Sequence, residues 1–122
     1  MMKIQESAEN YLESILKLKE ELSRVRAIDI VNELGFSKPS VSIAMKNLKE
    51  NGYINISDNG SIELTEKGFE IANKTYIKEK LITKLLVSFG VSIEQAKIDA
   101  CKIEHVISDE SIECIKKQLN EE

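Results

Sequence analysis

The spacing of apolar side chains predicts an amphipathic helix near the start of the chain. Between Ser7 and Leu22, apolar residues stand at positions 8, 11, 12, 15, 18 and 22, which is the period of a helix with one buried face. The other side of this helix is polar and carries Glu6, Glu9, Asn10, Glu13 and Lys17.

Two shorter helices are predicted next, joined by a tight turn. The first has apolar residues at 27, 30, 31 and 34, and Gly35 is placed to end it. Ser37 caps the second, Pro39 lies in its first turn, apolar residues at 41, 44, 45 and 48 form its buried stripe, and Gly52 stops it. Two short helices around a glycine-containing turn are typical of a helix-turn-helix.

A β-hairpin is predicted after the third helix. In the segment YINISDNGSIEL, two short β-rich runs flank Asp58, Asn59 and Gly60, and Asn-Gly between such runs is a strong hairpin signal. Helix, helix-turn-helix and hairpin in this order predict a winged helix.

The rest of the chain has the pattern of three helices. Thr65 caps a helix that runs to about Phe89 and ends at Gly90, and Ser92 with Gln95 forms a capping box for a helix through about residue 107. Ser108 opens a last helix toward Leu119. The residues of the long fourth helix that we expect to be buried are Ile71, Leu81, Ile82, Leu85, Leu86 and Phe89.

Length and composition agree with a small mainly α protein. The chain has 122 residues, 42% of them apolar, which is enough for a core without disulfide staples. The opening MMKIQESAEN lacks the apolar run of a signal peptide, and the longest apolar stretch, LITKLLVSFGV, is too short to span a bilayer. We therefore expect a cytoplasmic protein, with Cys101 free or bound to metal and Cys114 in the core.

Charge is distributed in a way that favours DNA binding by the third helix. The net charge of -4 argues against a nucleic-acid partner, but residues 37 to 49 contain three lysines and no acid. Hydroxyl groups and lysines on the exposed face suit phosphate contacts, whereas Ile43 either packs against thymine methyl groups or is an ordinary exposed apolar residue. The predicted DNA contacts are Ser37, Lys38, Pro39, Ser40, Ser42, Ile43 and Lys46.

A second candidate site lies in the segment ACKIEHVISDE. If residues 93 to 107 are helical, Cys101, Glu104 and His105 stand at i, i+3 and i+4 on one face. Thiolate, carboxylate and imidazole together suit a divalent first-row transition metal. Two other interpretations stay open: the three are ordinary structural residues, or Cys101 is a nucleophile with His105 as its base.

Several segments together resemble one known family. DACKIEHVISDE, NYLESI, SKPSVSIAMKNLKENGYI and LTEKG are similar to the metal-dependent repressors of the diphtheria toxin repressor and manganese transport regulator type. The resemblance covers about residues 6 to 119 and ends where the short members end, before the SH3-like domain of the long ones. It implies a winged-helix DNA-binding domain over residues 1–70 and a helical dimerisation and metal-binding domain over residues 71–122.

The resemblance also implies partners and a ligand set. Members of the family are homodimers, here joined through the carboxy-terminal helices, and their metal-bound form binds double-stranded operator DNA. Carried over by position, the metal ligands are Cys101, Glu104 and His105 on the fifth helix and Glu13 on the first.

Two positions depart from the family pattern. Asn10 stands where the family has methionine or aspartate, and its neutral carbonyl oxygen weakens the site or leaves water there. Glu79 stands at the position of a family histidine, where it either binds metal through oxygen or pairs with neighbouring lysines.

The implied cofactor is Fe(II) or Mn(II), because Cys101 is typical of iron-type members and Glu13 of manganese-type ones. A metal held by both domains would fix the spacing of the two recognition helices in the dimer. The alternatives are a metal-independent winged-helix regulator with a decayed site, or a thiol redox sensor acting through Cys101. An enzyme is not expected.

Overall fold

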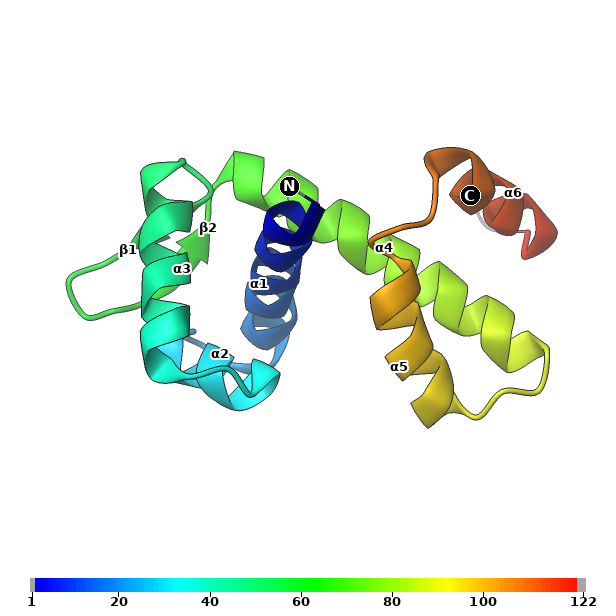
Figure 1. Ribbon diagram of the computed structural model, residues 1–122, viewed down its shortest axis with the longest axis horizontal. Helices are drawn as coiled ribbons and strands as arrows, with labels where there is room; N and C mark the ends of the chain where they lie inside the picture. The colour runs from blue at the N-terminus through cyan, green and yellow to red at the C-terminus, as the bar shows by residue number, and fades with distance from the viewer. Residues whose placement is uncertain (1, 121–122) are drawn as a thin grey trace. The chain divides into compact units, whose positions relative to one another are not determined.

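The chain forms six helices and one two-stranded sheet, which the computed structural model describes for residues 2–120, with side chains from Ser7 onward. The described residues divide after Asn73 into two compact units. In chain order the elements are α1 (Met2–Glu21), α2 (Ala27–Leu34), α3 (Lys38–Glu50), β1 (Ile54–Ile56), β2 (Ile62–Leu64), α4 (Glu66–Ser88), α5 (Ile93–Ile103) and α6 (Asp109–Gln118) (Figure 1).

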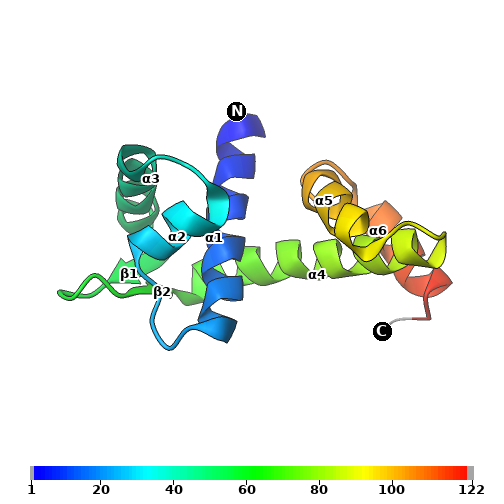
Figure 2. The ribbon, with the colours of Figure 1, turned by 90° about the horizontal axis from the view of Figure 1, so that it is seen from below.

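The first unit is a winged helix, as predicted. Helices α1, α2 and α3 and the β1–β2 hairpin surround one core together with the first turns of α4 (Figure 2). The buried members of this core are Tyr11, Leu12, Ile15, Leu18, Val25, Ile30, Val41, Met45, Leu48, Ile54, Ile62 and Ala72. Burial of side chains of this size stabilises the fold by about 1.5–3 kcal/mol each, so this one core accounts for the arrangement of all these elements.

The predicted ends of α2 and α3 are confirmed. Gly35 follows α2 with φ 73°, a left-handed conformation that glycine adopts without strain, and its N–H donates to the Val31 carbonyl. The Ser37 hydroxyl accepts from the Ser40 N–H at the start of α3. Helix α1 begins at Met2, earlier than the predicted Ser7.

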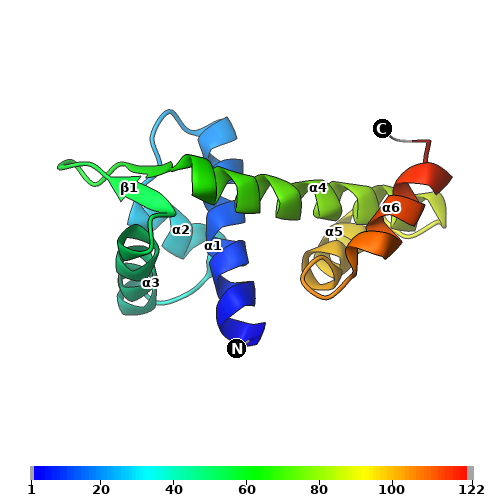
Figure 3. The same cartoon turned by 90° about the horizontal axis from the view of Figure 1, so that it is seen from above.

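The wing is the predicted hairpin. Strands β1 and β2 are antiparallel, with Ile54 opposite Leu64 and Ile56 opposite Ile62, and the loop between them extends away from the helices (Figure 3). The Ile62 N–H donates to the Val25 carbonyl at 2.7 Å, so the segment between α1 and α2 lies beside β2. This pairing ties the wing to the helix-turn-helix.

The second unit contains α5, α6 and the part of α4 after Asn73. Its core consists of Leu81 and Ile82 from α4, Ala100 from α5 and Ile112 from α6. The Ser92 and Ser108 hydroxyls accept from backbone N–H groups three residues on, at Gln95 and Ser111, as predicted. No helix among the described residues is long and apolar enough to cross a membrane.

Four details of the predicted second unit are wrong. Helix α5 ends at Ile103 rather than about residue 107. The capping box is only half made, because the Gln95 amide donates to Asp99 at 2.8 Å. Phe89 is 72% exposed rather than buried, and Cys114 is exposed rather than in the core.

A close backbone approach joins the wing to the first turn of α4. A Cβ atom built on Gly68 would lie 2.0 Å from the backbone oxygen of Tyr53, which is far inside van der Waals contact. The Thr65 hydroxyl donates to the Gly52 carbonyl at 2.7 Å and accepts from the Gly68 N–H at 3.2 Å. Only glycine fits at position 68 in this packing.

Substitution Gly68→Ala should therefore destabilise the protein, although alanine is the better helix former. We expect a loss of about 1–3 kcal/mol in the free energy of unfolding, typical of overpacking against backbone. Urea denaturation followed by circular dichroism measures it. The exposed position Glu70 on the same helix is the control, and Glu70→Ala should change stability by no more than about 0.5 kcal/mol. Equal stability of Gly68→Ala and the wild type would contradict the packing.

Candidate functional site

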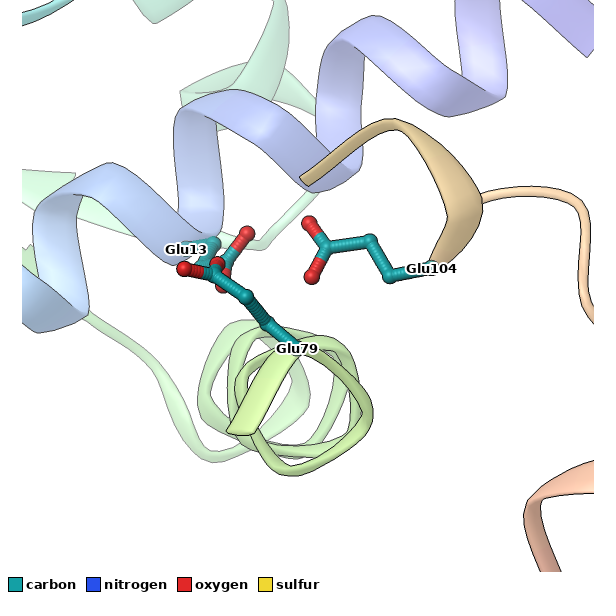
Figure 4. Close-up of side chains that lie close together, drawn as sticks. All are labelled: Glu13, Glu79 and Glu104. Atoms are coloured by element: carbon teal, nitrogen blue, oxygen red, sulfur yellow. The ribbon is translucent and has the colours of Figure 1, made fainter. Parts of the chain in front are cut away.

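Two buried carboxylates face one another in the second unit. Glu79 lies on α4, and Glu104 is the C-cap residue directly after α5. Oxygen atoms of the two side chains lie within 4.8 Å of one another. Figure 4 shows both side chains extending into the same space. Glu79 is 9% exposed and Glu104 is 2% exposed, so water has little access to either charge.

His105 lies beside Glu104. Its Nε2 lies 3.4 Å from Glu104 Oε1, and its side chain is 2% exposed. His105 lies in the turn after α5 rather than on the helix, because α5 ends at Ile103. The structure thus places Glu104 beside Glu79 and His105 beside Glu104, with Glu104 and His105 in a turn. The single helical face that the sequence predicted for Cys101, Glu104 and His105 is wrong, because the helix ends at Ile103.

Cys101 stands on the last turn of α5 and is partly buried. It does not belong to the group of side chains whose ligand atoms all lie within 4.8 Å of one another. Glu79 is in that group. The structure therefore gives Glu79, whose role was left open by sequence, a more direct place in the candidate site than Cys101.

The residues present fit a divalent metal. Two carboxylates at this separation repel each other, and burial makes that repulsion stronger than it is in water. A cation between them removes the repulsion, and carboxylate oxygens with a neutral imidazole form a normal ligand set for Mn(II) or Fe(II). This donor chemistry lies entirely within the second unit.

The two other predicted ligands lie on α1 in the first unit. Glu13 is 2% exposed, with Lys17 Nζ 3.5 Å from its Oε2. Its burial differs from the sequence expectation, which placed Glu13 on the polar side of the helix. Asn10, one turn earlier on α1, is partly exposed.

A charge cluster links α6 to α4 close to the candidate metal site. Asp109, the first residue of α6, lies 3.5 Å from Lys74 Nζ and 3.5 Å from Lys78 Nζ. The two lysines are one turn apart on α4, and Lys78 directly precedes Glu79 in the chain. The positive charges of Lys74 and Lys78, in that order of effect, lower the pKa of the Asp109 carboxyl, so this carboxylate is ionised over the whole neutral range.

The predicted DNA-contacting residues form one exposed surface at the start of α3. All seven, Ser37, Lys38, Pro39, Ser40, Ser42, Ile43 and Lys46, are exposed, and Ile43 is 63% exposed. The stripe on the opposite side of α3 contains Val41, Met45 and Leu48 and is buried. The hydrophobic pattern therefore identified the two faces of α3 correctly.

Hydroxyl groups at the start of α3 are arranged so that one of them can donate outward. The Ser37 hydroxyl donates to Ser40 Oγ at 2.9 Å and accepts from the Ser40 N–H at 3.2 Å. This leaves the Ser40 O–H proton for an acceptor such as a phosphate oxygen. Hydroxyl donors at a helix amino terminus are common phosphate contacts.

Sequence analysis missed an exposed apolar segment in the second unit. Around the connection of α4 and α5, Val87, Phe89, Ile93 and Ile98 are 40%, 72%, 50% and 53% exposed. Their apolar spacing continues that of α4, so the sequence could not distinguish burial in the chain's own core from burial against another molecule. Large exposed apolar residues close together in the chain are typical of an interaction surface.

Family models match both units. The model "Iron dependent repressor, N-terminal DNA binding domain" matches residues 3–61. The model "Iron dependent repressor, metal binding and dimerisation domain" matches residues 65–121. The two matches follow one another and together cover nearly the whole chain.

The curated relatives are named as transcriptional regulators or repressors. An uncharacterized HTH-type transcriptional regulator of Methanocaldococcus jannaschii is 38% identical over 113 residues, 91% of this chain and 90% of that protein. Transcriptional regulator MntR of Escherichia coli is 30% identical over 111 residues, 91% of this chain and 72% of that protein. Iron-dependent repressor IdeR of Mycobacterium tuberculosis is 31% identical over 121 residues, 98% of this chain and 53% of that protein.

Solved structures agree with the fold. The manganese regulator SloR superimposes with a TM-score of 0.79 at 28% identity and covers 93% of this chain. A manganese-dependent transcriptional repressor in complex with manganese gives a TM-score of 0.85 at 23% identity and covers 93% of this chain. The chain spans about half the length of both, 53% and 52%.

Proposed function

The chain belongs to the iron-dependent repressor family, and from this premise we propose that it is a DNA-binding repressor of metal-homeostasis genes with a divalent transition metal as co-repressor. The observation that carries the proposal is the match of a DNA-binding model and a metal-binding model in the family's order. The exposed face of α3 and the buried carboxylates of the second unit support the two activities separately.

The alternative functions are not favoured. The relatives are named as transcriptional regulators and repressors, which argues against an enzyme or a thiol sensor acting through Cys101. Glu79 and Glu104 supply carboxylate oxygens of the kind that a divalent metal binds, which supports an intact rather than a decayed metal site. A regulator of this kind works where the DNA is, in the cytoplasm.

For the metal, we propose Glu79, Glu104 and His105 as the ligands within the second unit, with Cys101 from the preceding turn. Glu13 and Asn10 are proposed as ligands from the first unit on the strength of the family resemblance. The bound metal supplies positive charge. Glu79 and Glu104 would neutralise that charge, and His105 would offer one ring nitrogen as a ligand beside Glu104.

The donor set favours Fe(II) or Mn(II). Carboxylate oxygens suit Mn(II), a thiolate suits softer ions, and affinity alone would favour zinc. Mostly oxygen ligands with one imidazole weaken the preference for soft ions. Metal availability in the cell then selects between iron and manganese.

Metal-dependent binding should be visible in a mobility shift with genomic DNA containing the operator, under anaerobic conditions. We expect Mn(II) or Fe(II) to produce the shift and a chelator to abolish it. His105→Ala should weaken metal affinity at least about 10- to 100-fold, as loss of a metal-supporting group does, and so lose the shift at metal concentrations that saturate the wild type. Glu113→Gln, at an exposed site on α6, is the control.

A mobility shift that persists in the presence of the chelator would show that DNA binding does not depend on metal. The wild type would then be a metal-independent regulator. A shift that is unchanged in His105→Ala at every metal concentration would remove His105 from the ligand set.

For DNA, we propose that α3 enters the major groove with its first turns foremost. Ser37, Ser40 and Ser42 contact phosphates, Lys38 and Lys46 supply positive charge, and Pro39 lies against the DNA beside them. Ile43 is 63% exposed at the centre of this face, where its side chain meets the methyl group of a thymine.

Replacing thymine by uracil in the operator tests Ile43, since this change removes only the methyl group. At the contacted position we expect the wild type to lose about fourfold in affinity, the value of one buried methyl group. Ile43→Ala should bind both duplexes equally, and Ile28→Ala, an exposed isoleucine on α2, should behave as the wild type. Loss of affinity from uracil in both wild type and Ile43→Ala would contradict the contact.

We further propose that the carboxy-terminal unit forms a homodimer. The exposed apolar residues Val87, Phe89, Ile93 and Ile98 support this, because a second copy covering them would remove large apolar side chains from water. A two-fold dimer would present two α3 helices to half-sites about one DNA turn apart.

Phe89→Glu should convert the dimer to a monomer, since an ionised carboxylate in an apolar interface is strongly unfavourable. Sedimentation velocity at micromolar concentration measures the change. Ile28 is also an exposed apolar residue, with 43% of its surface accessible, but it lies on α2, so Ile28→Glu should remain dimeric. If Phe89→Glu is dimeric too, the interface lies elsewhere.

A further inference from the structure

The turn that carries Glu104 and His105 must be held in place from both sides. On the α5 side, the Glu104 N–H donates to Ala100 at 2.9 Å and the Ile107 N–H donates to Ile103 at 3.0 Å. On the α6 side, Ser108 caps the helix through the Ser111 N–H. These hydrogen bonds fix the turn to its own two helices. Ile103 and Ile107, on either side of Glu104 and His105, pack against the core that includes Leu81 and Ile82 of α4, and Asp109 adds a polar contact to that helix.

The contact between Asp109 and α4 is charged and reaches the helix at two points. Asp109 Oδ2 lies 3.5 Å from Lys74 Nζ, and Asp109 Oδ1 lies 3.5 Å from Lys78 Nζ. One carboxylate thus bridges two lysines a helical turn apart. The Lys78 side chain is only 16% exposed, so its ammonium group is held against the protein rather than extending into solvent.

The position of this bridge connects it to the proposed metal ligands. Asp109 is four residues after His105, and Lys78 is the residue before Glu79. A chain segment of four residues is short, so a shift of α6 along α4 carries His105 with it. The bridge therefore acts on the relative position of the imidazole and the Glu79 carboxylate.

We propose that Asp109 is a positioning residue for the metal site, acting through Lys74 and Lys78 to keep α6 and the Glu104–His105 turn in register with α4. The proposal rests on the metal site proposed above. Asp109 does not touch the metal. A negative side chain at the first residue of α6 also suits the positive end of that helix, which accounts for its place in the helix but not for its reach to α4.

The size of the effect follows from the exposure of the partners. Asp109 is 71% exposed and Lys74 is 64% exposed, and exposed ion pairs contribute little individually. We therefore expect loss of the bridge to weaken metal affinity by about two- to fivefold. The difference should shrink at high salt, because salt screens exposed charges.

Two variants distinguish a positioning role of Asp109 from a field effect, by which we mean a direct electrostatic effect of the changed charge on the metal ion. Asp109→Asn removes a negative charge near the site, so it weakens metal binding under either explanation. The double variant Lys74→Gln with Lys78→Gln removes positive charges, so a field effect alone would tighten metal binding, whereas loss of the bridge weakens it. Lys116→Gln is the control, because Lys116 pairs at 3.3 Å with Glu113 on α6 itself and does not reach α4.

The experiment measures Mn(II) affinity of the full-length protein by competition with a fluorescent chelator, at low and high salt. Unfolding temperature is measured in parallel to show that each variant is folded. We expect Asp109→Asn and the double lysine variant both to bind Mn(II) about two- to fivefold more weakly than the wild type at low salt, with Lys116→Gln unchanged.

Tighter Mn(II) binding by the double lysine variant, or wild-type affinity in Asp109→Asn, would overturn the positioning role and leave the proposed function intact. Absence of Mn(II) binding in the wild type would overturn the proposed metal dependence, and the positioning role with it.

Discussion

The proposed metal site in the second unit depends on two buried carboxylates, Glu79 and Glu104. The two side chains are almost fully buried, and their oxygen atoms lie within 4.8 Å of one another. A helical domain could fill this space with apolar side chains at lower cost. Carboxylate oxygens are ligands that a divalent cation such as Mn(II) accepts, which agrees with the proposed metal site.

The first unit also has a local distribution of charge that differs from that of the whole chain. The chain has a net charge of -4, yet residues 37 to 49 expose lysines, hydroxyl groups and an isoleucine and contain no acid. The Ser37 cap and the left-handed Gly35 set where α3 begins, and the wing is tied to the helices through Val25 and through the close approach at Gly68. These contacts fix the position of the proposed DNA-contacting surface within the first unit.

Much of this arrangement was predictable because it depends on local physics. Capping by Ser37, Ser92 and Ser108, termination at Gly35 and the Asn59-Gly60 hairpin are decided by a few neighbouring residues, and all were confirmed. The end of α5 was not predictable in this way. Residues 104 to 107 contain no glycine or proline. The helix ends at Ile103, and Ile103, Ile107 and Ile112 all pack in the core with α4, a tertiary arrangement that no local signal indicates.

The sequence by itself determined the winged helix, the two faces of α3 and the residue types of a metal site, because period, caps and side-chain chemistry are properties of short segments. Only the tertiary structure decided which of those residues meet. In the structure, Glu79 lies beside Glu104, and His105 lies in a turn. Glu13 is buried and Phe89 is exposed. Asp109 pairs with Lys74 and Lys78. Each of these outcomes depends on the packing of helices distant in the chain, and helical periodicity carries no information about which helix, or which second molecule, will cover a given face.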